Sequence, residues 1–314
     1  MTNRKMWGEK PYHSLDYEMK SRFGQKVYKI SLDGGMTCPN RDGLLDTRGC
    51  IFCSGSGSGD FAAPRSTSVT AQITQGIEGI SKRKKVGSKF IAYFQSFTNT
   101  YGPVSYLEPL YKEALAHPDV VMLSIATRPD CLPPEVLELL AECNQIKPVI
   151  VELGLQTSNE STAQFIRRGY PLAVYDKAVA DLKNLGIEVV THVIAGLPGE
   201  TEDNFFASLD HVASCHSDGI KIQLLHILNG TDLAGLYNSG NCKVLTQEKY
   251  IDLVIRSIAL LPPEMVIHRL TGDGPKDLLI APLWSSHKRD VLNEIHRQLK
   301  QQNIWQGKEY KNHE

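Results

Sequence analysis

The chain has 314 residues, of which 41% are hydrophobic and 22% are charged, so it can bury the core of one large domain or two small ones. Its formal net charge of −1 at pH 7 excludes a global positive field that would attract nucleic acid, and a polyanion would need a local basic patch. The longest apolar run begins at Val120 and is far too short to span a membrane, and the polar start of the chain carries no export signal, so we expect a cytoplasmic protein without a membrane partner.

Short apolar runs alternate with longer helical patterns, which is typical of parallel strands joined by crossover helices. We predict strands at residues 26–32, 89–94, 120–126, 149–155, 188–194 and 219–225. We predict helices at residues 69–85, 106–116, 134–143, 172–185 and 202–214, several of them opened by capping residues and closed by Gly or Pro. The pattern fits either an open barrel or a doubly wound sheet, because periodicity alone does not separate the two.

The pattern changes after Thr246. A helix at 247–261, a short strand at 266–270 and a last helix at 286–302 follow, and we interpret residues 233–306 as an α/β appendage that covers the core at 26–232. Residues 1–25 are read as an N-terminal extension. Residues 307–314 are charged and poor in apolar side chains, so we expect a flexible tail.

Three cysteines follow the first predicted strand: Cys38, and then Cys50 and Cys53 in a CxxC pair. In a parallel α/β fold the carboxyl ends of the strands are where chemistry is built. Grouped cysteines in a reducing compartment indicate metal ligands, and three thiolates suit a [4Fe–4S] cluster that keeps one iron open. Zinc with a distant fourth ligand such as His13 or Cys131, and a CxxC without function, remain alternatives.

The later strand ends carry polar motifs in a fixed order. They read YFQSFTNT at 93–100, SIATRPD at 124–130, ELGLQT at 152–157, RRG at 167–169 and AGLPG at 195–199. With the cysteines, these residues resemble the radical S-adenosylmethionine (radical SAM) superfamily, in the branch that contains the elongator catalytic subunit and the oxygen-independent coproporphyrinogen oxidase. The resemblance runs from about Val27 to Asp232 and implies a partial (β/α)₆ barrel.

The resemblance also implies the cofactors and their contacts. It places a [4Fe–4S] cluster on Cys38, Cys50 and Cys53 and S-adenosylmethionine (SAM) beside it. The implied SAM contacts are Phe52, Thr98, Ser124, Gln156, Arg168, His192 and Gly196. Gln156 and His192 would meet the ribose, Arg168 the carboxylate, and Phe52 the adenine. Arg128 is equally suited to a structural ion pair with Asp130, and no residue that acts on the substrate is identified.

The implied activity is reductive cleavage of SAM to a 5′-deoxyadenosyl radical that takes hydrogen from a substrate, with an electron donor such as flavodoxin or ferredoxin. The elongator-like resemblance implies tRNA, at the C5 side chain of a wobble uridine. A small-molecule or protein substrate, and a zinc-bound RNA-binding module without activity, remain alternatives.

Basic residues for RNA contact are expected in the appendage rather than at residues 82–85. That basic run ends the first predicted helix, on the side opposite the cysteines, where the helix dipole favours positive charge. The expected RNA contacts are Arg269, Lys276, Lys288, Arg289, Arg297 and Lys300.

Overall fold

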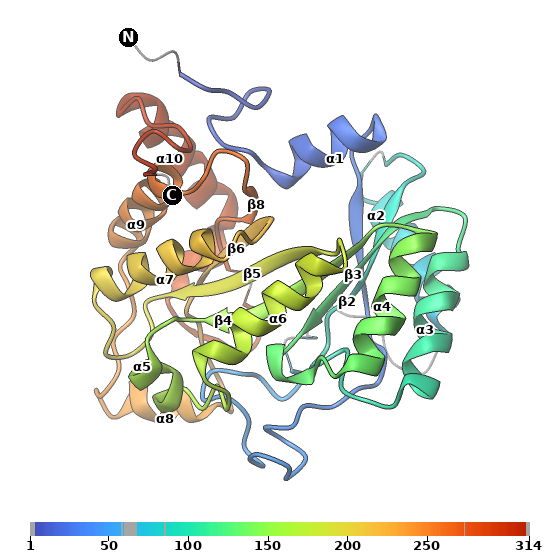
Figure 1. Ribbon diagram of the computed structural model, residues 1–314. Coiled ribbons are helices and arrows are strands. Elements are labelled where there is room, and N and C mark those ends of the chain that lie inside the picture. Colours follow the sequence, from blue (N-terminus) through green and yellow to red (C-terminus); the bar gives the residue numbers. More distant parts are fainter. Residues whose placement is uncertain (1–3, 58, 60–67, 85, 273, 312–314) are drawn as a thin grey trace.

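The structure is a computed structural model that describes residues 4–57, 59, 68–84, 86–272 and 274–311. Its centre is a seven-stranded parallel sheet in the order β1-β2-β3-β4-β5-β6-β8. The strands are β1 (Tyr28–Leu32), β2 (Phe90–Phe94), β3 (Val120–Thr127), β4 (Val149–Gln156), β5 (Glu188–Ala195), β6 (Gly219–Leu224) and β8 (Val266–Arg269). The sheet curls into a half-barrel (Figure 1), and the predicted α/β fold with a partial barrel is confirmed.

Helices join the successive strands along the outer face of the half-barrel. They are α2 (Val69–Ser81), α3 (Val104–Ala116), α4 (Pro134–Ile146), α6 (Leu172–Asn184) and α7 (Glu202–Ser214). Helix α2 ends before its predicted end, and the exposed Lys82, Arg83 and Lys84 follow it; Lys85 lies outside the described residues. The short α5 (Glu160–Phe165) lies between β4 and α6. Its 6 residues are too few to show a helical apolar pattern, so the sequence did not predict it.

The strands β2 to β6 are buried on both faces, and β4 shows how their side chains divide. Val149, Val151, Leu153 and Leu155 belong to the main core, which includes side chains of the outer helices. Ile150 points to the opposite face, because successive side chains of a strand alternate. The outer face of the sheet is therefore a continuous apolar layer against the helices. The inner face does not pack against these helices, so it can hold polar side chains.

Helix α1 (Leu15–Phe23) closes one end of the half-barrel, within the segment that we expected to be an extension. Its Met19 packs on inward side chains of β2, β3, β4 and β5, namely Ile91, Met122, Ile150 and Val190. The sequence did not predict α1, because Met19 is the helix's one buried residue and leaves no amphipathic stripe. Figure 1 shows α1 at one end of the sheet and the loop after β1 at the other.

The C-terminal segment adds to the barrel as well as covering it. Strand β8 extends the sheet beside β6, so residues 233–306 are not only the covering appendage that we expected. The segment also contains α8 (Asp232–Asn238), α9 (Gln247–Leu260), α10 (Lys288–Gln301) and the 3₁₀ turn η2 (Leu283–His287). Strand β9 (Leu279–Ala281) pairs with β7 (Ile227–Leu228), which follows the carboxyl end of β6.

The start of the predicted flexible tail is tied to α9. The backbone N–H groups of Gly307 and Glu309 donate to the carbonyls of Ile258 (3.3 Å) and Ala259 (2.9 Å), and residues 312–314 lie outside the described range. Residues 307–309 are therefore joined to α9 by backbone hydrogen bonds, and a flexible tail over 307–314 stays a prediction. Among the helices of the described residues, none combines the length and the apolar composition needed to cross a membrane.

Candidate functional site

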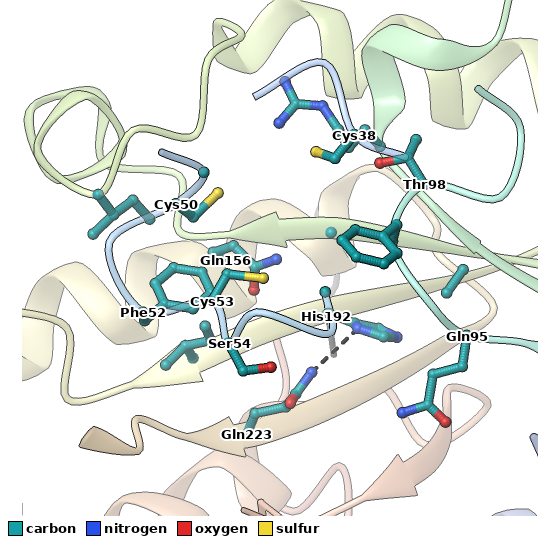
Figure 2. Close-up of a pocket in the computed structure, with 18 of the residues that line it drawn as sticks. Cys38, Cys50, Phe52, Cys53, Ser54, Gln95, Thr98, Gln156, His192 and Gln223 are labelled. Carbon is teal, nitrogen blue, oxygen red and sulfur yellow. Dashed lines mark hydrogen bonds between the residues drawn. The ribbon is translucent and has the colours of Figure 1, made fainter. Parts of the chain in front are cut away.

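A cavity of about 250 Å³ lies at the carboxyl ends of the strands, at the end of the half-barrel opposite α1. Cys38, Cys50 and Cys53 all line it. Figure 2 shows their sulfur atoms facing one common space between the loop after β1 and the strand ends. The structure thus brings together the three cysteines that the sequence grouped.

The loop that carries the cysteines is held by its own hydrogen bonds. The Gly49 N–H donates to the carbonyl of Asn40 (2.7 Å), and the Arg41 guanidinium donates to the carbonyls of Cys53 (2.9 Å) and Ser54 (2.6 Å). The Asn40 amide reaches Sγ of Cys50 at 3.5 Å. Burial raises the pKa of Cys50 to about 12, so a metal at this thiol must displace its proton.

The alternative zinc ligands are placed differently from one another. His13 lies beside α1, at the other end of the barrel, where its Nε2 is 2.9 Å from the Glu18 carboxylate. Cys131 is buried and its Sγ lies 3.8 Å from Asp130. His13 is therefore excluded as a ligand shared with the cysteines, whereas Cys131 follows the pair of Arg128 and Asp130, of which Arg128 lines the cavity, and requires a direct test.

Arg128 forms the ion pair with Asp130 that the sequence left open. Its Nε and a terminal nitrogen donate to the two carboxylate oxygens at 2.9 and 2.7 Å, and its guanidinium lies 5.2 Å from the centre of the Tyr170 ring. The pair holds a fixed cation in the lining of the cavity. Gly169 has φ +86°, and a Cβ there would lie 2.7 Å from Asn40 Oδ1 and 3.1 Å from the Arg128 guanidinium. A side chain at this position would disturb both groups.

Arg168 also lines the cavity, but its donors are directed at protein acceptors. Nε donates to the carbonyl of Tyr170 (3.0 Å), and one terminal nitrogen donates to that of Thr157 (2.6 Å). The other terminal nitrogen lies 3.3 Å from both carboxylate oxygens of Glu160. Its side chain is 2% exposed. This differs from the expected contact with a SAM carboxylate: Arg168 braces the turn after β4, and Arg128 presents the less enclosed cation.

Gln156, at the end of β4, combines two unfavourable features. Its φ of +69° lies in the left-handed region, which costs a non-glycine residue about 1–3 kcal/mol. Its Oε1 is buried, and no described residue donates to it. A buried acceptor without a partner costs about 1–3 kcal/mol. The turn that Arg168 braces therefore offers a hydrogen-bond acceptor to a ligand with a hydroxyl group.

The floor of the cavity is a polar layer, to which each of the strands β1 to β6 contributes one side chain. In strand order they are Lys29, Tyr93, Ser124, Glu152, His192 and Lys221. Glu152 is the common acceptor. Ser124 (2.8 Å), the Tyr93 hydroxyl (2.9 Å) and His192 Nε2 (2.8 Å) bond to it, and both lysines form ion pairs with it. The layer therefore ties six strands to one carboxylate.

The charges of this layer follow from burial and from the excess of cations. Burial opposes ionisation of Glu152, but Lys221 and Lys29 outweigh it and hold the pKa of Glu152 well below its usual range. Burial also lowers the pKa of Lys221 to about 7, although Glu152 opposes the shift. His192 has a pKa lowered to about 4 by burial and by Lys221, so it is neutral at pH 7.

The expected SAM contacts divide into three groups. Phe52, Thr98 and Gln156 line the cavity (Figure 2). Arg168 and His192 line it too, but with their nitrogens already bonded within the protein; His192 Nδ1 lies 3.2 Å from the Gln223 amide. Among the described residues, Ser124 and Gly196 lie outside the lining. Ser124 belongs to the polar layer and donates to Glu152 without lining the cavity, and a Cβ on Gly196 would meet Leu245 at 3.0 Å.

Lys29 and Lys221 were not predicted as site residues from the sequence, and Tyr93, the first residue of the motif at 93–100, was given no role there. A signal was present, because Lys29 and Lys221 are the charged residues of β1 and β6, and a charge in a parallel strand inside a barrel must find a partner there. Arg269, expected to contact RNA, instead lines the cavity and is half-buried. Its guanidinium belongs to the interior site rather than to the outer surface.

The remaining basic candidates separate along α10. Lys288 and Arg289 begin this helix, shortly after β9, whose partner β7 leaves the carboxyl end of β6. Further along, the Tyr12 hydroxyl bonds to His296 Nε2 at 3.0 Å, so Arg297 and Lys300 lie beside the N-terminal segment. Lys276 is exposed in the connection between β8 and β9. Lys288 and Arg289 are therefore on the side of the cavity mouth, and Arg297 and Lys300 are not.

Comparisons with known proteins identify the family of the chain. Residues 47–212 match the family described as the Radical SAM superfamily, and residues 217–301 match the Radical_SAM C-terminal domain. Uncharacterized protein YtqA of Bacillus subtilis is 46% identical over 96% of this chain and 93% of its own length. Elongator complex protein 3 of Schizosaccharomyces pombe is 30% identical over 56% of this chain, which spans about a third (32%) of that protein.

A solved structure shares the fold. The archaeal Methanocaldococcus infernus Elp3 superposes with a TM-score of 0.69 at 17% identity, over 89% of this chain and 64% of that chain. The resemblance inferred from the strand-end motifs is therefore confirmed. The chain belongs to the radical SAM superfamily, whose cofactors are a [4Fe–4S] cluster and S-adenosylmethionine.

Proposed function

We propose that Cys38, Cys50 and Cys53 hold the [4Fe–4S] cluster, that SAM occupies the adjoining cavity, and that the enzyme modifies tRNA at the C5 side chain of a wobble uridine. The observation that carries the cofactor assignment is the convergence of three thiols on one cavity that also presents the unpartnered Oε1 of Gln156. The tRNA substrate rests on the resemblance to the elongator catalytic subunit, which the partial likeness to Elongator complex protein 3 supports.

The residues of the chain would orient and shield the cofactor. When bound and reduced, the cluster supplies the electron that cleaves the C–S bond of SAM to give a 5′-deoxyadenosyl radical. Gln156 would accept a hydrogen bond from a ribose hydroxyl, and Arg128 would face the carboxylate with a fixed cation. Phe52 packs against the apolar cluster of Ile51, Ile166 and Ile194, which would keep water from the radical. Flavodoxin or ferredoxin is the proposed electron donor.

The inner end of the cavity would receive the reacting group of the substrate. Tyr93, Lys221 and Gln223 line it, above the carboxylate of Glu152. Glu152 is ionised and fully bonded, so it is not suited to take a proton. Lys221, with a pKa near 7, is the group in this layer best suited to exchange one with the substrate.

The substrate is tested by comparing nucleosides. We expect tRNA from a strain that lacks the gene to lose a modified wobble uridine and to accumulate its precursor, as measured by liquid chromatography and mass spectrometry. Complementation with the wild-type gene should restore the product, whereas a Cys38→Ala gene should not. Identical nucleoside profiles in the two strains would reject the tRNA substrate and favour a small molecule or a protein.

Gln156→Leu is expected to weaken SAM binding. The substitution keeps the size of the side chain and removes the acceptor, and one neutral hydrogen bond is worth about 0.5–1.5 kcal/mol, or roughly 2- to 12-fold in affinity. Equilibrium binding of SAM to the anaerobically reconstituted enzyme measures the effect. Gln156→Glu, which keeps an acceptor, is the matched control and should bind more tightly than Gln156→Leu. Equal affinity for the leucine variant and the wild type would remove Gln156 from the SAM site.

Alanine at both Lys288 and Arg289 is expected to weaken tRNA binding and to flatten its salt dependence by roughly one unit of slope for each lost phosphate contact. SAM cleavage without RNA should persist, because the cofactor lies inside the barrel. The control removes Arg297 and Lys300 from the other end of α10 and should leave tRNA affinity unchanged. The measurement is the tRNA affinity of each variant at several salt concentrations. An equal loss of affinity in both double variants would mean that tRNA does not bind at the mouth of the cavity.

A further inference from the structure

A second group of potential metal ligands lies on the outer face of the barrel, apart from the cysteine loop. It consists of Asp176 on α6, His211 on α7 and Cys215, which caps the end of α7. One potential ligand atom from each residue lies within 4.8 Å of the other two. Figure 1 shows α6 and α7 covering the same outer face of the sheet, so these three side chains connect two neighbouring helices.

The distances between the three atoms are close to the edges of a tetrahedron around zinc. Cys215 Sγ lies 3.6 Å from His211 Nε2 and 3.6 Å from Asp176 Oδ1. Typical zinc bonds of about 2.3 Å to sulfur and about 2.0–2.2 Å to nitrogen or oxygen give tetrahedral edges of roughly 3.5 Å to the sulfur. The third edge, from Nε2 to Oδ1, is 2.6 Å. This is a hydrogen bond, and a metal would open it by less than about 1 Å.

The local structure directs all three groups to one point. His211 and Cys215 are four residues apart at the end of one helix, which places them on the same face. The His211 ring packs against that of Tyr175 with their centres 6.0 Å apart, and Tyr175 is anchored by a 2.7 Å hydrogen bond between its hydroxyl and Thr191. The neighbouring Asp176 is thereby fixed opposite the histidine.

The same Nε2 atom of His211 faces both the thiol and the carboxylate. In a chain of nucleophile, base and acid, the histidine would instead use its two nitrogens for the two partners. Convergence on a single nitrogen is the geometry of a shared ion and not of an activated thiol. The side chains of His211 and Asp176 are 25% and 43% exposed, so an ion can reach the group from solvent.

We propose that Asp176, His211 and Cys215 bind a zinc ion that joins α6 to α7. One sulfur, one imidazole nitrogen and one carboxylate oxygen form a donor set typical of zinc, with the fourth position left to water. Binding releases the proton of the thiol to solvent, while His211 keeps one proton on Nδ1 and offers the lone pair of Nε2 to the ion. The site is independent of the iron–sulfur cluster and of the choice of substrate.

The test uses the full chain with its iron–sulfur cluster reconstituted, so that the cluster cysteines are occupied. The protein is incubated with zinc ion, passed over a chelating resin, and assayed for zinc and iron. We expect the wild type to retain zinc, and X-ray absorption at the zinc edge to show one sulfur ligand among nitrogen and oxygen ligands. Iron does not contribute at that edge, so the cluster does not interfere.

Two variants and one control complete the design. Cys215→Ser should weaken zinc binding by more than about 100-fold, since loss of a direct ligand exceeds the 10–100-fold cost of losing a supporting contact. Asp176→Asn keeps a hydrogen bond to His211 but lacks the charge and should also lose zinc. His216→Asn alters an exposed neighbouring histidine, with φ +55°, that asparagine tolerates, and should retain it.

The iron content of each variant shows that its barrel is folded. Zinc retained equally by Cys215→Ser and the wild type would overturn the site, as would a wild type that retains none. A zinc environment without sulfur would also overturn it.

Discussion

Alanine at Cys38 is expected to abolish the visible absorbance of the iron–sulfur cluster and, with it, reductive cleavage of SAM. The three cysteines line one cavity, and three thiols would hold three of the four irons of the cluster. Removal of one thiol would leave two irons without a protein ligand, and SAM would fill only one of these positions. We expect the same result for Cys50→Ala and Cys53→Ala. Anaerobic reconstitution, followed by iron analysis and measurement of 5′-deoxyadenosine, tests all three variants.

Two other cysteines provide the controls. Cys143→Ala changes a buried residue on α4 within the main core and should keep the cluster and the activity. Cys131→Ala tests the zinc alternative directly, because Cys131 is the nearby candidate for a fourth ligand. We expect it to retain the cluster, whereas loss of the metal from both Cys131→Ala and Cys38→Ala would support a four-ligand zinc site. A normal cluster in Cys38→Ala would contradict the proposed ligand set.

Glu152→Gln is expected to destabilise the fold by about 3–5 kcal/mol, the usual cost of leaving a buried charge without its partner. The substitution is nearly isosteric, but it removes the one negative charge that Lys29 and Lys221 share inside the barrel. The strands β1 and β6 are joined through these ion pairs, so the loss is felt across the sheet. Thermal or urea unfolding of the cluster-free protein measures it.

The control for this variant is Glu188→Gln at the start of β5. Glu188 pairs with Arg22 at 2.5 Å, but both side chains are about one-third exposed, so the loss should stay below about 1 kcal/mol. A Glu152→Gln variant as stable as Glu188→Gln would show that the polar layer does not hold the strands together.

The stability difference should also depend on pH. The pKa of Glu152 is held well below its usual range in the folded protein, whereas a glutamate in the unfolded chain has a pKa of about 4.3. The contribution of Glu152 is therefore complete above the unfolded pKa and is lost as the pH falls toward the folded pKa. We expect the stability difference between wild type and Glu152→Gln to begin to shrink as the pH falls through about 4.3, and to keep shrinking as the pH approaches the folded pKa.

The contacts of Arg168 and His192 show that strand-end motifs can predict that a residue lines the cavity but not which groups it binds. Both residues line the cavity, as the resemblance implied. The motif does not state where their nitrogens point, because this depends on acceptors elsewhere. Glu160 and the Thr157 carbonyl engage Arg168, and Glu152 engages His192. Their proposed role in SAM binding consequently remains a prediction, and the acceptor of Gln156 is the better-supported contact.

The position of the seventh strand in the sheet and the presence of α1 could not be predicted from the sequence, for a similar reason. Strand β8 was correctly predicted as a short strand, but its place beside β6 depends on a connection that returns from the C-terminal segment. Helix α1 has a single buried residue, so its sequence shows no amphipathic pattern from which a helix could be predicted. The helix packs on the end of the barrel with that residue.

The sequence by itself determined the alternation of strands and helices, the grouping of Cys38, Cys50 and Cys53 after β1, and the family. These features are local, since apolar periodicity and ligand spacing are written within a few consecutive residues. Only the tertiary structure decided that Lys29, Glu152 and Lys221 meet, and that Asp176 faces His211 and Cys215. The physical reason is that these contacts join side chains far apart in the chain. They depend on the pairing register of the sheet and on the packing of helices against it, which no short stretch of sequence specifies.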